Sequence, residues 1–164
     1  MTVLSGISSL TGALLITMAL SAQPSLDSIS VKTVRGAIVP FSSIAKNERV
    51  ILLCFWSVNS DQSVSELNAI NAQFEKWKQA ASFRLVAVCV DEGNILNRMR
   101  PTANMNGWTF DVCGDINGDL RKAFNVNDVL PKSVLLDKGQ VVYQQSGFEP
   151  GSERYFFSKI QALR

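Results

Sequence analysis

Two uninterrupted apolar runs, separated by one amphipathic stretch, constrain the fold of this chain more than any other feature. The runs are Val50–Trp56 and Leu85–Val90. Continuous hydrophobicity is typical of a strand that helices cover on both faces, whereas a half-exposed strand alternates. Between the runs, over residues 64–81, apolar side chains recur at spacings of three and four, which indicates an amphipathic helix. The three segments therefore predict a βαβ unit with parallel strands.

The remaining segments extend this unit into a larger sheet. The pattern predicts a hairpin from strands at 30–34 and 37–41, a short helix at 95–99 limited by Pro101, a strand at 108–112, a helix at 119–124, a strand pair at 133–136 and 141–144, and a closing helix at 152–163 with Ser152 as its N-cap. We therefore expect an α/β fold in which helices flank a mixed central β-sheet with an N-terminal β-hairpin.

The N-terminal segment has the features of an export signal. Residues 2–26 carry no charge, Leu10–Leu20 is an apolar run of the length of a signal-peptide core, and small residues follow at 19, 21 and 22. No Lys or Arg precedes the run, so an uncleaved anchor stays open. We expect residues 1–22 to be a signal peptide or N-terminal anchor and 23–164 one domain, exported to the periplasm or cell envelope, with membrane contact only through an uncleaved N-terminal segment.

Composition narrows the chemistry. The 164 residues contain no histidine, which removes the commonest general base, the usual zinc ligand and any Ser-His or Cys-His pair. Three widely separated cysteines form neither a zinc motif nor a disulfide framework. The net charge of +2 shows no long basic run, so no nucleic-acid partner is indicated. We expect no metal and no cofactor.

One segment carries a family resemblance. Phe55-Trp56-Ser57-Val58-Asn59-Ser60-Asp61-Gln62-Ser63 resembles the F-W-A-x-W-C-x-x-C segment of thioredoxin-like proteins of the TlpA/ResA (redoxin) type. In the same order, Val90-Asp91-Glu92 resembles the end of the family's next strand, 127–131 the turn before its cis-proline, and 133–142 its following hairpin. The resemblance covers residues 28–164 and implies a thioredoxin fold with thiol-disulfide activity.

The chain departs from that family at the reactive positions, because the resemblance places the two redox cysteines at Ser60 and Ser63. A helix N-terminus lowers a pKa by about one unit, which makes a thiol reactive but leaves a serine hydroxyl protonated. A hydroxyl also cannot exchange with a disulfide. We therefore expect no catalytic residue in this loop. Ser60 or Ser63 would cap the following helix, and Ser63 with Glu66 would form a capping box.

The cysteines that remain are weak substitutes for the missing pair. Cys54 and Cys89 lie inside apolar strands, where a thiol is ordinarily an inert small hydrophobe. Cys113, beside Gly114 and Asp115 at a strand end, is the one expected to meet solvent. A thiol-disulfide oxidoreductase or peroxidase that uses Cys113 is therefore the enzymatic alternative.

The resemblance also implies a surface beside the proline turn. In thioredoxin folds the residue before the cis-proline offers its backbone to an extended peptide. Here the predicted binding residues are Trp56, Asn59, Ser60, Asp61, Gln62, Leu130 and Pro131. The leading hypothesis is a redox-inactive thioredoxin-like module that binds an extended polypeptide by strand addition. A vestigial groove, with Trp56 and Leu130 as core residues, stays open.

Overall fold

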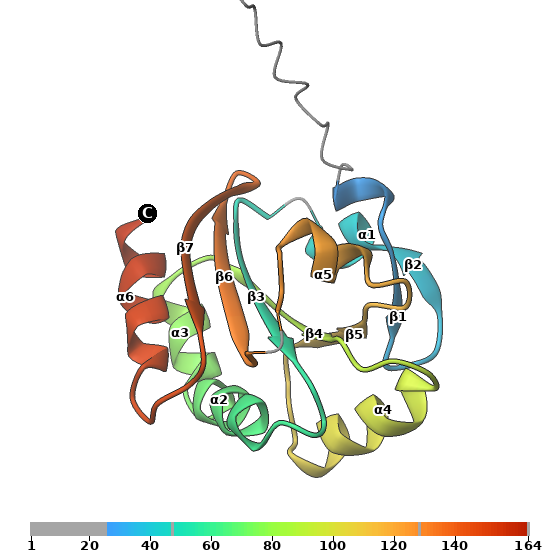
Figure 1. Cartoon of the computed structure of the whole chain (residues 1–164). Helices are drawn as coiled ribbons and strands as arrows, with labels where there is room; N and C mark the ends of the chain where they lie inside the picture. The colour runs from blue at the N-terminus through green and yellow to red at the C-terminus, as the bar shows by residue number, and fades with distance from the viewer. Residues whose placement is uncertain (1–25, 47, 128, 164) are drawn as a thin grey trace, which may run out of the picture.

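The computed structural model describes residues 26–46, 48–127 and 129–163. After a short 3-10 helix, η1 (Leu26–Ser28), seven strands form one mixed sheet in the order β2-β1-β5-β4-β3-β6-β7 (Figure 1). The strands are β1 (Ser30–Thr33), β2 (Ile38–Pro40), β3 (Val50–Trp56), β4 (Arg84–Cys89), β5 (Asp111–Gly114), β6 (Lys132–Asp137) and β7 (Gln140–Ser146). β3, β4 and β5 run parallel to one another. β1 pairs antiparallel with β5, β6 with β3, and β7 with β6.

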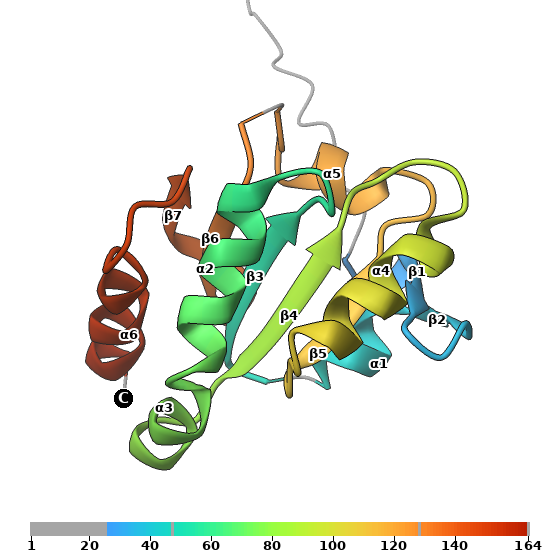
Figure 2. The same ribbon diagram turned by 90° about the horizontal axis from the view of Figure 1, so that it is seen from below.

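Helices cover both faces of the sheet. α2 (Asp61–Asn71), α3 (Phe74–Ala80), α4 (Ile95–Met105) and α6 (Glu153–Ala162) pack into one hydrophobic core, while α1 (Phe41–Ala45) and α5 (Asp119–Ala123) pack into the other. Figure 2 shows α2 and α4 side by side on the same face. The predicted α/β fold with a mixed sheet between helices is confirmed.

The burial of β3 on both faces explains why its sequence is continuously apolar. Leu52, Cys54 and Trp56 point into the core under α2, and Leu53 and Phe55 into the core under α1 and α5, each fully buried. Six registered pairs join β3 to β4 and six join it to β6. A strand enclosed in this way has no solvent face on which a polar side chain would be favoured.

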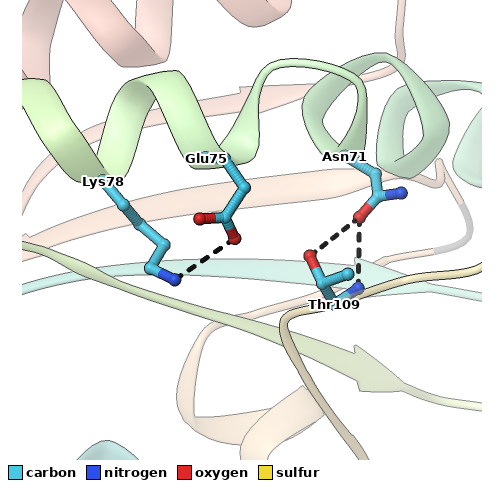
Figure 3. Close-up of polar contacts among 4 residues, drawn as sticks. All are labelled: Asn71, Glu75, Lys78 and Thr109. Atoms are coloured by element: carbon cyan, nitrogen blue, oxygen red, sulfur yellow. Dashed lines mark hydrogen bonds and ion pairs between the residues drawn. The ribbon is translucent and has the colours of Figure 1, made fainter.

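The expected helix over 64–81 is two helices. α2 ends at Asn71, and α3 begins at Phe74. At the break the Asn71 side chain binds the loop before β5. Its Oδ1 accepts hydrogen bonds from the Thr109 N–H at 3.1 Å and from the Thr109 Oγ1 at 3.3 Å (Figure 3). Its Nδ2 donates to the Gly107 carbonyl at 3.2 Å. These tertiary contacts fix the end of α2, and the local sequence does not predict them.

Pro101 does not end α4. The helix continues to Met105 with Pro101 inside it, so the predicted limit is wrong. Met99 and Ala103, on either side of the proline, are buried against the sheet, and Pro101 itself is exposed. Core packing on one face of the helix thus compensates for the loss of the backbone hydrogen bond that a proline cannot donate.

Other element boundaries also differ from those predicted. The strand expected at 108–112 lies at Asp111–Gly114, and Phe41, expected at the end of a strand, begins α1 and is buried. Ser152 stands before α6 but accepts no capping bond there; instead Glu153 Oε2 accepts the Gly151 N–H at 2.9 Å. The hairpin of β1 and β2 around Arg35-Gly36 is confirmed, with Gly36 at φ 93°, where a Cβ would be strained.

The predicted signal peptide or anchor, residues 1–22, lies outside the described residues. Within the described ranges no helix has the length and hydrophobicity needed to span a bilayer.

Candidate functional site

The candidate site forms where β3 ends and α2 begins. The connecting loop is held by Asp91, which follows β4: its carboxylate accepts the Ser57 hydroxyl and, at 3.0 Å, the Val58 N–H. Because β3 and β4 are adjacent and parallel, their carboxyl ends meet at this edge of the sheet. The loop is therefore fixed by a side chain from the neighbouring strand.

Ser60 is the N-cap of α2. Its backbone is extended (φ −107°, ψ 103°), and its Oγ accepts the Ser63 N–H at 3.2 Å. The same hydroxyl lies 3.5 Å from the Leu130 carbonyl oxygen, to which it donates. The predicted capping role is confirmed for Ser60, and the contact joins the start of α2 to the turn before β6.

Glu66 does not form the predicted capping box. It lies on the inner face of α2, 1% exposed, and its Oε2 accepts a hydrogen bond of 2.9 Å from Oγ of Ser133 on β6. Because Ser63 and Glu66 are three residues apart on one helix, both turn toward the core. Across the described chain, neither Ser63 Oγ nor Glu66 Oε1 has a hydrogen-bond partner. The capping-box prediction is wrong because burial in the tertiary structure overrides the local pattern.

Burial also changes the acidity of Glu66. Loss of hydration raises the pKa of its carboxyl to about 7; the Ser133 hydrogen bond opposes the rise, and the nearby charge of Glu153 adds to it. Ser133 was not among the predicted site residues. Its only signal was a hydroxyl among the apolar residues of a buried strand.

Two of the predicted groove residues, Leu130 and Pro131, lie opposite Ser60. Their peptide bond is cis, Leu130 is half-buried and Pro131 is buried. Over the residues that the structure describes, the Leu130 N–H has no hydrogen-bond acceptor. Asn59, Asp61 and Gln62 are exposed around the start of α2, where the groove was expected.

Trp56 is not part of this surface. Its side chain is 0% exposed and packs edge-on against Trp108, with ring centroids 4.9 Å apart. The prediction that Trp56 is a binding residue is therefore wrong, and the alternative that it is a core residue holds, because its position on β3 turns it into the core under α2.

All three cysteines are buried and carry free thiols. Burial raises the pKa of Cys89 to about 12 and raises the pKa of both Cys54 and Cys113 well above the ordinary range. The prediction that Cys113 meets solvent is wrong, because its side chain on β5 points into the core under α1 and α5. The inert character expected for Cys54 and Cys89 agrees with their burial.

A family comparison fits this geometry. Residues 24–145 match the AhpC/TSA family. The chain belongs to the AhpC/TSA family. No curated protein sequence matches it.

Solved structures place the AhpC/TSA chain among thioredoxin-like proteins. An uncharacterized thioredoxin-like protein from Porphyromonas gingivalis is 30% identical, with a TM-score of 0.71 over 84% of this chain and 90% of that one. A secreted Mycobacterium tuberculosis disulfide oxidoreductase homologous to E. coli DsbE shares 15% identity, with a TM-score of 0.65 over 83% and 96%. The bacterioferritin comigratory protein of Xanthomonas campestris shares 16%, with a TM-score of 0.68 over 84% and 92%. The last two likenesses show the fold alone.

A hollow lies beside this candidate site. A cavity of about 420 Å³ adjoins Gln62 and is lined further by Tyr143, Phe148 and Tyr155. It lies between the start of α2 and the start of α6, next to Gly147, whose N–H donates to the Pro131 carbonyl at 2.7 Å. The described ranges contain no cluster of three acidic or cysteine side chains able to hold a metal ion.

Proposed function

We propose that this AhpC/TSA-family chain binds an extended polypeptide on the surface formed by Ser60 and the Leu130–Pro131 turn, without thiol-disulfide chemistry. The observation that carries the proposal is the Leu130 N–H, which has no acceptor in the described structure and belongs to a residue in contact with the N-cap of α2. An unpaired backbone donor in an extended segment can pair with the backbone of an incoming chain, which is the interaction that strand addition uses. The finer resemblance to TlpA/ResA-type proteins, with Ser60 and Ser63 in the cysteine positions, is part of this proposal.

The proposed lack of redox activity rests on the groups present at this surface. Ser60 Oγ accepts the capping hydrogen bond of α2 and donates to the Leu130 carbonyl. Among the described side chains no base contacts it. Ser63 is fully buried. Oxygen at these positions cannot form or resolve a mixed disulfide.

An oxidoreductase or peroxidase that uses Cys113 is the alternative function. The fold shared with the disulfide oxidoreductase and the comigratory protein is compatible with it. A thiolate must reach its substrate, however, and Cys113 is 0% exposed with a raised pKa. The site geometry therefore favours binding over thiol catalysis.

We also propose that the chain is exported, on the strength of the uncharged N-terminal segment with its apolar run at 10–20. N-terminal sequencing of protein recovered from the envelope fraction tests this. A start at residue 22 or 23 supports cleavage, whereas a cytoplasmic protein with an intact Met1 contradicts export.

Binding is tested with a probe that has no thiol. The insulin B chain, with both cysteines blocked by iodoacetamide, is added to ¹⁵N-labelled protein while the amide resonances are followed. We expect the Leu130 amide proton to move downfield and to become protected from exchange, since it gains an acceptor. Amides on β2, at the opposite edge of the sheet, serve as the internal control. A Leu130 amide that does not respond at saturating peptide contradicts the proposal.

A variant pair provides a second test of binding. Leu130→Pro removes the donor, and Leu130→Ala keeps it while removing the side chain. We expect Leu130→Pro to lose about tenfold in affinity, the equivalent of one hydrogen bond of about 1.4 kcal/mol, and Leu130→Ala to lose less. Equal losses would assign the binding to the side chain instead.

A further inference from the structure

Acidic residues are missing from two segments of the chain. The chain has 14 Asp and Glu residues, yet none falls in residues 28–47 or 93–110. The same segments contain five cations: Lys32, Arg35, Lys46, Arg98 and Arg100. The near-neutral total charge therefore conceals a local excess of positive charge.

The fold brings the two acid-free segments together. The Arg100 Nε donates a hydrogen bond to the Val34 carbonyl, which joins α4 to the turn between β1 and β2. Gly36 in that turn lies so close to Leu96 that an added Cβ would stand 3.2 Å from its Cδ2. Figure 2 shows α4 between α2 on one side and β1 and β2 on the other. We call the surface formed by Arg35, Arg98 and Arg100 the basic face.

A hollow lies within the basic face. It has a volume of about 440 Å³ and is lined by Val34, Arg35, Arg100 and Asn104. In the described chain Arg35 has no hydrogen-bond or ion-pair partner, and Arg100 has only the Val34 carbonyl. Asp111, the next acid after the second segment, is engaged by Arg84 at 2.6 Å. Two guanidinium groups thus flank a concavity that contains no carboxylate, and a carboxylate is the group that such a pair binds in bidentate fashion.

Exposed apolar side chains lie on the same elements. Met105 at the end of α4 is 86% exposed, and Ile38 on β2 is 62% exposed. A partner that combines acidic side chains with apolar ones would match both the charge and the hydrophobicity of this surface.

The basic face adjoins the surface proposed to bind the polypeptide. Arg98 Nη2 donates a hydrogen bond of 2.6 Å to Oδ1 of Asn59, which is in the loop between β3 and α2. A chain bound beside Ser60 and Leu130 can therefore pass over Asn59 onto α4 without leaving the protein surface.

From this adjacency and charge we infer that the occupant of the basic face is an acidic segment of the same extended polypeptide. The inference rests on the proposed function and specifies its partner: a chain that adds as a strand at Leu130 and carries carboxylates a few residues away, which enter the hollow between Arg35 and Arg100. The concave shape and the link through Asn59 favour a polypeptide over a flat lipid surface.

The test uses two synthetic peptides of about 14 residues that are identical except that four Glu in one are Gln in the other. Fluorescence anisotropy on the full-length protein measures both affinities at low and at physiological salt. We expect the Glu peptide to bind about tenfold more tightly at low salt, with the difference shrinking as salt rises. The double variant R35Q/R100Q should reduce the ratio to about two. The matched control K76Q/R154Q removes the same charge from α3 and α6 and should leave the ratio unchanged.

The outcomes separate this inference from the proposed function. Binding of neither peptide overturns the proposed function. Equal binding of the two, or an equal loss of the ratio in the K76Q/R154Q control, overturns only the acidic specificity. Vesicles containing 30% phosphatidylserine test the alternative of a membrane surface. If the vesicles retain the protein, R35Q/R100Q abolishes that retention, and the protein shows no preference for the Glu peptide, the basic face binds a membrane and the inference is contradicted.

Discussion

Ser133 on β6 donates a hydrogen bond of 2.9 Å to Oε2 of Glu66 on α2, and both side chains are buried. The bond ties the first helix after β3 to the strand that follows the Leu130–Pro131 turn. It therefore ties α2 to β6 within the core, while Ser60 and Leu130 join the start of α2 to the cis-proline turn through a 3.5 Å contact.

Glu66 should make the stability of the protein fall as pH rises. Its pKa is raised to about 7 in the folded state, above the value of about 4.5 of an exposed carboxyl, so the native state holds the proton longer than the unfolded state. As far as this group is concerned, the free energy of unfolding is therefore greatest below pH 4.5, and roughly 3 kcal/mol of it is lost as the pH rises from about 4.5 through about 7. Urea unfolding between pH 4.5 and 8 measures the slope. Glu66→Gln should flatten it, and Glu75→Gln, an exposed acid on α3, should not; a parallel curve for Glu66→Gln would contradict the assignment.

Ser60→Ala should destabilise the fold by about 1 kcal/mol, because the Ser63 N–H loses its acceptor at the N-terminus of α2. Ser65→Ala, an exposed position inside the same helix, is the control and should change the free energy of unfolding by less than about 0.5 kcal/mol. Chemical denaturation at fixed pH compares the three proteins. A Ser60→Ala protein as stable as the parent would show that the cap contributes nothing.

The three thiols should resist modification in the folded protein. Cys54, Cys89 and Cys113 are each 0% exposed, and their pKa values are raised by burial. Reaction with a chromogenic disulfide reagent should be at least about 100-fold slower in native buffer than in denaturant, since modification requires opening of the fold. One thiol that reacts quickly under native conditions, and stops doing so in Cys113→Ala, would revive the oxidoreductase alternative.

Insulin reduction in the presence of dithiothreitol should not exceed the uncatalysed rate. The double variant S60C/S63C should raise it, because sulfur would then stand at the N-cap of α2, where the helix N-terminus lowers a thiol pKa. The single variant S60C, which lacks the resolving thiol, is the control and should not turn over. Activity of the parent protein above background would refute the proposed lack of redox function.

Gly114→Ala should destabilise the protein by about 1 to 3 kcal/mol. A Cβ at this position on β5 would lie 2.7 Å from Cδ1 of Ile95, the first residue of α4. The double variant G114A/I95V removes that methyl group and should recover part of the loss in thermal unfolding. Absence of any recovery would place the strain elsewhere.

The polar contacts of the site could be anticipated only in part. Ser60 was predicted as a helix cap from its place before an amphipathic stretch, and the local sequence was sufficient for that. Glu66 has the same spacing to Ser63 as a capping box, but its carboxylate binds Ser133, 67 residues further along the chain. Cys113 was expected to meet solvent from its place at a strand end, and Trp56 was counted among the binding residues because of the family resemblance, with a place in the core left open. In both cases the direction of the side chain within the sheet puts the residue in the core.

The linear pattern of hydrophobicity by itself determined the βαβ unit, the mixed sheet and the place of the serines at the head of α2, because strand and helix periods and capping act over a few residues. Only the tertiary structure decided that α4 passes through Pro101, that Glu66 is buried with a raised pKa, and that Arg35 and Arg100 share a hollow. Those outcomes depend on desolvation and on contacts between segments far apart in the chain. The free energy of such contacts is set by the completed fold and leaves no local mark in the sequence.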